Sequence, residues 1–219
     1  MNARLSSGHP RNWLLTIPAI VLGLAAGTSA AWDDDHRMTL HSATFTDGGT
    51  LPLSMISEIQ LPNGQNACTA DGSTGGNQSP QLSWRHAPEG TRSFAVVAYD
   101  ITAQFTHWII YNIPAGTIGL PDNAGVPGSS FGVQNENDFF NGVPGYNGPC
   151  PPPNVTPFAH QYQFTVYALD RMLPVVPAFG EFVPAGPEGF YQELLKAGLK
   201  GHVLASASIS GFFSSTPGS

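Results

Sequence analysis

Four long runs of β-branched and aromatic residues constrain the fold of this 219-residue chain more than any other feature. Each run is bounded by glycine, proline, asparagine or aspartate, and the runs cover residues 93–100, 106–114, 160–170 and 201–213. Such composition and boundaries are typical of β-strands. Several runs are apolar on both faces, which predicts a sheet that is covered on each side. We therefore expect a mainly β domain.

One amphipathic helix is expected after the third run. Pro187 suits the first helical turn, and Phe190, Leu194 and Leu195 are spaced to share one face. The glycines that follow should end this helix. Most of the 25 glycines and 20 prolines fall in long loops, so we expect one or two short helices at most.

The N-terminal segment has the three zones of a secretory signal. A polar start is followed by an apolar run from Trp13 to Ala26 and then by small residues suited to cleavage near Ala30 or Ala31. No cysteine lies at that junction to carry a lipid anchor, and the apolar run is short for a membrane span; an uncleaved anchor is the alternative. We predict a signal peptide over 1–31, a mobile acidic stretch over 32–40, one domain over 41–213 and a tail over 214–219.

The charge of the chain limits its partners. The formal charge is −7, and it becomes −9 without the signal, because Arg4 and Arg11 are lost and all 15 acidic residues remain. Nucleic-acid binding needs a basic surface, so no nucleic acid is expected as a partner. We expect a secreted or periplasmic protein with no transmembrane anchor in its mature form.

Two cysteines, Cys68 and Cys150, lie in loops rich in glycine, proline and asparagine. In an oxidising compartment an even number of cysteines favours a disulfide. Two unrelated thiols are the alternative, because sequence alone fixes no distance between them.

His107 stands at the start of the second run, in the stretch FTHWIIYNIPAG. Strict strand alternation would place its imidazole on the same face as Phe105, Ile109, Tyr111 and Ile113. The first two runs are joined by a short connection, so they predict an antiparallel hairpin.

In that hairpin, Asp100 ends one strand and His107 begins the next. His160 opens the third run directly after a proline-rich loop. These three side chains are therefore expected at one rim of the sheet, where loops on a rigid scaffold commonly carry binding groups.

Several motifs in order carry a family resemblance. NQSPQLSWRHAPEGTRSFAVVAYD, THWIIYNIPAG, LPDNAG, QNENDF, GYNGPCPPP, HQYQFTVYALD and GHVLASASISG resemble the phosphatidylethanolamine-binding protein family, and most of all its bacterial branch, described as Raf kinase inhibitor-like. The resemblance covers roughly residues 40 to 213. It implies a large antiparallel sheet packed on a smaller sheet with peripheral helices.

The resemblance also implies an anion pocket and a disulfide between Cys68 and Cys150 beside it. In that pocket, His107 and His160 would donate hydrogen bonds to a phosphate or carboxylate. Carried over position by position, the ligand-binding residues are Asp100, Phe105, His107, Tyr146, Gly148, Pro149, Pro151, His160 and Tyr162.

The chain departs from the family pattern at the pocket. The second aspartate and both prolines of an Asp-Pro-Asp-x-Pro motif are replaced by Ile101, Thr102 and Gln104, and Gln161 stands where the family has arginine. Glutamine cannot supply the fixed charge or the bidentate donor of arginine. These changes predict weaker anion binding or a different ligand.

Three classes of function stay open. The first is a binding protein for a small phosphorylated ligand or a phospholipid headgroup, the second an inhibitor of a protease or another protein partner, and the third a hydrolase or metalloenzyme. Catalysis is the least favoured, because no Gly-x-Ser-x-Gly motif is present and cysteines in a disulfide offer no thiolate. No cofactor or metal is expected; the acidic cluster WDDDHR reads as a solvated terminus.

Overall fold

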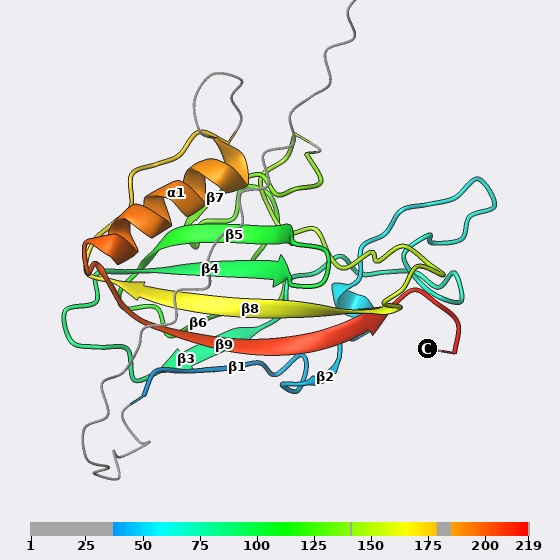
Figure 1. Ribbon diagram of the computed structural model, residues 1–219, viewed down its shortest axis with the longest axis horizontal. Coiled ribbons are helices and arrows are strands. Elements are labelled where there is room, and N and C mark those ends of the chain that lie inside the picture. Colours follow the sequence, from blue (N-terminus) through cyan, green and yellow to red (C-terminus); the bar gives the residue numbers. More distant parts are fainter. Residues whose placement is uncertain (1–36, 141, 179–184, 219) are drawn as a thin grey trace, which may run out of the picture. The chain divides into compact units, whose positions relative to one another are not determined.

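The computed structural model describes residues 37–140, 142–178 and 185–218 (Figure 1). The predicted signal peptide and residues 32–36 of the acidic stretch lie outside this part of the chain. The described elements are β1 (Thr39–His41), β2 (Gly49–Thr50), the 3-10 helix η2 (Leu53–Met55), β3 (Leu82–Arg85), β4 (Ser93–Asp100), β5 (Phe105–Pro114), β6 (Gly119–Leu120), β7 (Val133–Gln134), β8 (Ala159–Leu169), α1 (Gly186–Leu199) and β9 (Val203–Ser214).

The larger sheet contains the four runs predicted from the sequence as β4, β5, β8 and β9. Its strand order is β2-β9-β8-β4-β5-β7. Neighbouring strands are antiparallel except for the short β2, which runs parallel to β9. Figure 1 shows the four long strands side by side, with β4 ending and β8 beginning at the same end of the sheet.

A smaller antiparallel sheet, in the order β1-β3-β6, packs on one face of the larger sheet. The core between the two sheets contains Leu82 and Trp84 from the smaller sheet and Phe94, Val96 and Phe164 from the larger one, all nearly inaccessible to solvent. The prediction of a large sheet packed on a smaller one is therefore confirmed.

Helix α1 packs on the opposite face of the larger sheet. Its Phe190 is fully buried in a second cluster with Ile109 and Tyr111 of β5. The sequence placed Leu195 on the buried face as well, and this was wrong: its side chain is 51% exposed, because Ala197 takes the inner position in the last turn. No helix in the described ranges is long and apolar enough to cross a membrane.

Both ends of the predicted domain extend beyond the expected boundaries. Met38 and Leu40 are buried and β1 begins at Thr39, so the last residues of the stretch predicted to be mobile belong to the fold. At the other end, Ser215 is buried and its hydroxyl donates to the carbonyl oxygen of Cys68 over 2.8 Å.

Candidate functional site

Asp100 closes the turn between β4 and β5 with its own side chain. One carboxylate oxygen, Oδ1, accepts hydrogen bonds from the backbone N–H groups of Thr102 and Ala103 over 2.8 and 2.9 Å. An aspartate that bonds the backbone two residues ahead is a common turn-forming device. The second oxygen, Oδ2, is left for a partner on another strand.

That partner is His160, at the start of β8. Its Nδ1 lies 2.7 Å from Oδ2 of Asp100, and both side chains are buried, at 8% and 3% exposure. A carboxylate oxygen can only accept, so Nδ1 of His160 carries the proton. The ring is thereby oriented, with Nε2 as its second polar atom.

A β-bulge determines the direction of His107. Ala98 pairs with Trp108 and Tyr99 pairs with Thr106, so His107 is an extra residue in β5. Bulges commonly redirect a side chain near functional sites. The imidazole consequently packs against Tyr162, with ring centroids 5.2 Å apart.

The bulge corrects one inference from the sequence. Ile109 and Tyr111 belong to the cluster under α1, whereas His107 contacts Tyr162 of the core between the sheets. Strict alternation had put the three on one face. The expected proximity to Phe105 is present, with centroids 5.1 Å apart.

The protonation of His107 is set by a backbone carbonyl and by burial. Nδ1 donates to the carbonyl oxygen of Asn147 over 2.7 Å. Burial lowers the pKa of His107 to about 4, although the carbonyl of Asn147 and the charge of Asp100 act in the opposite direction. The ring is therefore neutral near neutral pH.

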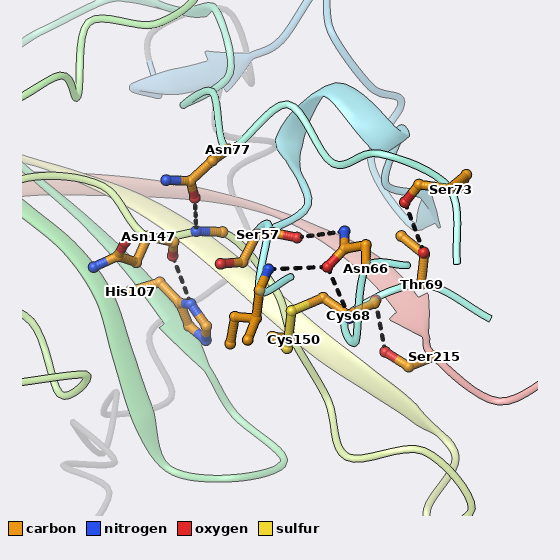
Figure 2. The surroundings of a disulfide bond; sticks show 12 residues. Ser57, Asn66, Cys68, Thr69, Ser73, Asn77, His107, Asn147, Cys150 and Ser215 are labelled. Atoms are coloured by element: carbon orange, nitrogen blue, oxygen red, sulfur yellow. Dashed lines mark hydrogen bonds between the residues drawn. A yellow bond between two sulfur atoms is a disulfide. The ribbon is translucent and has the colours of Figure 1, made fainter. Parts of the chain in front are cut away.

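The loop that holds His107 is itself fixed by the segment between η2 and β3 (Figure 2). The N–H of Gly148 donates to Oδ1 of Asn77 over 2.7 Å, and the carbonyl of Pro149 accepts from the N–H of Ser57 over 3.0 Å. A Cβ at Gly148 would collide with the carbonyl oxygen of Met55, so the close approach of the two segments requires glycine there.

The predicted disulfide between Cys68 and Cys150 is present and joins the same two segments. The Cα atoms are 4.5 Å apart, and the bridge spans 82 residues of sequence. Cross-linking a loop of this length stabilises a fold by about 4 kcal/mol in the chain-entropy model. Cys150 lies in the same loop as Asn147, the hydrogen-bond partner of His107.

The side chains at this end of the sheet surround a cavity of about 210 Å³. Its wall combines four polar side chains with apolar groups, and the full lining is Asp100, Ala103, Phe105, His107, Phe139, Cys150, Pro151, Pro152, His160 and Tyr162. The hydroxyl of Tyr162 is buried without a partner at hydrogen-bond distance, and the carboxylate of Asp100 is the charged group that acts on it. Burial, and next the charge of Asp100, raise the pKa of Tyr162, so this hydroxyl keeps its proton.

Six of the nine predicted ligand-binding residues line the cavity, and three do not. Tyr146 is buried beside it and donates its hydroxyl to the carbonyl oxygen of Met55 over 3.0 Å. Gly148 and Pro149 hold the supporting loop through the backbone contacts described above. A role of any of the nine in ligand binding stays a prediction.

Sequence reasoning did not single out several parts of this wall. Phe139 packs edge-on against Phe105, with ring centroids 4.9 Å apart. It is the last residue of the motif QNENDF. Ala103 and Pro152 also line the cavity. The hydrogen bond to the carbonyl of Asn147 could not be predicted from the sequence, because every residue carries a backbone carbonyl.

Gln161, which stands where the family has arginine, does not line the cavity. Its backbone accepts from the N–H of Ile101 over 2.9 Å and donates to the hydroxyl of Thr102 over 3.0 Å. Within the described ranges, no group of three or more potential metal ligands is close enough to hold an ion.

The fold and the cavity define a class: a two-sheet β domain with a cavity of mixed polar and apolar lining at one end of its larger sheet. The chain belongs to the phosphatidylethanolamine-binding protein family, whose model matches residues 41–214. This confirms the resemblance inferred from the motifs.

Two curated relatives cover most of the chain. A UPF0098 protein of Methanothermobacter thermautotrophicus is 34% identical, over 80% of this chain and 98% of its own length. The UPF0098 protein YbhB of Escherichia coli is 38% identical, over 81% of this chain and its full length.

Solved structures agree with the fold. The crystal structure of Escherichia coli YbcL, described as a new member of the mammalian PEBP family, matches with a TM-score of 0.59 and 31% identity. It covers 81% of this chain and 98% of its own. A PEBP homologue from Chlamydia trachomatis matches with a TM-score of 0.57 at 26% identity, over 81% of this chain and 97% of its own.

Proposed function

We propose that this protein is a secreted or periplasmic binding protein whose cavity holds the phosphate of a small phosphorylated ligand or of a phospholipid headgroup. The observation that carries the proposal is the Tyr162 hydroxyl, which is buried in the cavity wall without a hydrogen-bond partner. Leaving such a group unsatisfied costs about 1 to 3 kcal/mol. A ligand oxygen in the cavity would satisfy it.

The histidines supply further polar atoms beside this hydroxyl. The rings of His107 and His160 lie 5.2 and 6.4 Å from the Tyr162 ring, centroid to centroid. Nδ1 of each histidine is already bonded within the protein, so Nε2 is the atom left for a ligand. Asp100 holds the His160 ring through Nδ1 and so orients its Nε2.

The size and lining of the cavity suit a headgroup better than a whole lipid. Pockets for drug-sized ligands usually exceed about 300 Å³, and this one has about 210 Å³. Phe105 and Phe139 exclude water from one side, which strengthens hydrogen bonds to an anion.

A catalytic role is not favoured by the cavity wall. Cys150 is the cysteine in that wall, and its sulfur is bonded to Cys68 in the disulfide, so it offers no thiolate. The disulfide and the predicted signal peptide both support a location in an oxidising compartment.

The proposal is tested by calorimetric titration of the purified protein with phosphoethanolamine and inorganic phosphate. We expect saturable binding that weakens at least about tenfold in Tyr162→Phe and in His160→Gln, the loss of one good hydrogen bond to a charged ligand. His202→Gln, remote from the cavity, is the matched control and should bind normally.

The control variant defines the outcomes that decide the proposal. Absence of binding with folded protein, or equal loss in the His202→Gln control, would contradict the proposal.

A further inference from the structure

The hydrogen on the His107 ring can be assigned from its surroundings. The carbonyl oxygen of Asn147 has no proton to give, so the contact of 2.7 Å requires a proton on Nδ1 of His107. A neutral imidazole carries one proton, and Nε2 then presents a lone pair. At this point of the cavity wall the protein accepts a hydrogen bond and does not donate one.

This tautomer is held by a reciprocal clamp. The N–H of Asn147 donates to the backbone carbonyl of His107 over 3.0 Å, in the direction opposite to the side-chain bond. The next residue, Gly148, is bonded to Asn77, and Cys150 is cross-linked to Cys68 (Figure 2). Turning the ring over would break the 2.7 Å bond between Nδ1 and the carbonyl oxygen of Asn147.

Aromatic neighbours keep the ring in place and neutral. Phe105, Phe139 and Tyr162 surround it with centroid distances of 5.1, 5.5 and 5.2 Å, and His107 is only 4% exposed. The depressed pKa of about 4, caused mainly by burial, agrees with a ring that stays neutral at pH 6 to 7. Asp100, His160 and Tyr162 are the titratable groups that share the cavity with it.

We propose that the cavity selects anions that carry an acidic hydroxyl, such as hydrogen phosphate or a protonated phosphate monoester, over sulfate and phosphate diesters. The inference rests on the proposed anion site and specifies its ligand. The ligand hydroxyl donates to Nε2 of His107, and another ligand oxygen accepts from the hydroxyl of Tyr162.

The physical reason is the mismatch that an anion without a hydroxyl creates. Sulfate and a phosphate diester have no proton for Nε2 of His107, so their oxygen lone pairs face the nitrogen lone pair in a water-poor site. Sites that leave a buried polar group unpaired discriminate strongly between otherwise similar ligands. Because the phosphate in an intact phospholipid is a diester, the same geometry favours soluble monoesters over lipid headgroups.

The experiment is a set of four titrations of the purified protein at about pH 6, where about half of a phosphate monoester is protonated. The ligands are inorganic phosphate, sulfate, phosphoethanolamine and glycerophosphoethanolamine. We expect phosphate to bind at least about tenfold more tightly than sulfate, and the monoester more tightly than the diester by a similar factor.

Each outcome separates this inference from the proposed function. Equal affinity for all four anions, or tighter binding of sulfate or of the diester, overturns the selectivity and leaves an anion site. Binding of none of them overturns both.

His107→Gln provides the matched variant, because a glutamine amide can turn either its donor or its acceptor to the ligand. We expect sulfate affinity to rise relative to phosphate, so that the ratio falls toward one, while His202→Gln keeps the wild-type ratio. An unchanged ratio in folded His107→Gln overturns the inference.

A measurement on the unmodified protein covers the case in which the variant does not fold. The ¹⁵N chemical shifts of the His107 ring should report a protonated Nδ1 and an unprotonated Nε2. A ring protonated on Nε2 at about pH 6, without ligand, overturns the inference.

Discussion

The two ends of strand β8 each carry an aspartate–histidine pair, in very different surroundings. At its start, His160 meets Asp100 over 2.7 Å with side chains 8% and 3% exposed. Beyond its end, Asp170 meets His202 over 3.1 Å with side chains 34% and 21% exposed. The residue types are the same, and the first pair lines the cavity described above.

The difference shows that the loops at the start of β8, and not the residue types, form the cavity there. The Asp100–His160 pair lies beneath the segments that are joined by the disulfide. The carboxylate of Asp170 is exposed to solvent and also accepts a hydrogen bond from Arg171. This bond lowers the pKa of Asp170. Four experiments can break or sharpen this contrast, and we give them from the largest expected effect to the smallest.

Removal of the disulfide should have the largest effect. Cys68→Ser together with Cys150→Ser should lower the free energy of unfolding by about 4 kcal/mol, because the unfolded chain regains the entropy of a long closed loop. Urea unfolding measures this change. We also expect the amide hydrogens of Asn147, Gly148 and the residue at position 150 to exchange faster while those near Asp170 are unaffected; uniform loosening would contradict a local role.

Neutralising the buried carboxylate comes next. Asp100→Asn should lower the free energy of unfolding by about 3 kcal/mol, since it removes one partner of a buried pair. The matched variant, Asp170→Asn, should shift the urea midpoint little, as expected of an exposed pair. Equal effects of the two variants would show that the difference in burial has no energetic consequence.

The pH dependence of stability should reveal the buried His107. Its pKa is about 4 in the folded protein and about 6.5 in an unfolded chain. The unfolded state thus binds more protons between these values, so stability from this group is complete above pH 6.5 and is lost as pH falls toward 4.

The loss should amount to about 3 kcal/mol over that window. Denaturant unfolding at several pH values, compared between the wild type and His107→Gln, isolates this contribution. The variant should show the shallower dependence; parallel curves would mean that His107 titrates normally.

The smallest effect is expected at the exposed histidine. His202→Gln should change neither the unfolding midpoint nor phosphate binding appreciably, because both partners of this pair are accessible to solvent. Differential scanning calorimetry and phosphate titration check the two properties. A large loss of either would show that the two ends of the sheet are coupled.

Much of the architecture could be predicted from the sequence. The four predicted strands are present with ends within two residues of the expected ones. Runs of β-branched and aromatic residues that are bounded by turn residues favour strands over other secondary structure. The expected meeting of Asp100, His107 and His160 at one cavity is also found. It followed from the hairpin connection and from the start of β8.

The orientation of His107 could not be predicted from alternation. The bulge between Ala98 and Tyr99 depends on pairing with a neighbouring strand, and sequence spacing does not show it. Leu195 was misplaced for a related reason, because the packing angle of α1 on the sheet decides which residues of its last turn are buried.

By itself, then, the sequence determined the strands, the family, the disulfide partners and the identity of the polar residues at the cavity. Local propensity and motif order are properties of the chain and can be read along it. Only the tertiary structure decided that His107 is neutral, that its Nε2 presents a lone pair and that Tyr162 is left without a partner. Those properties arise from burial and from the carbonyl of Asn147, forty residues away from His107 in sequence, and they exist only once the loops are packed on the sheet.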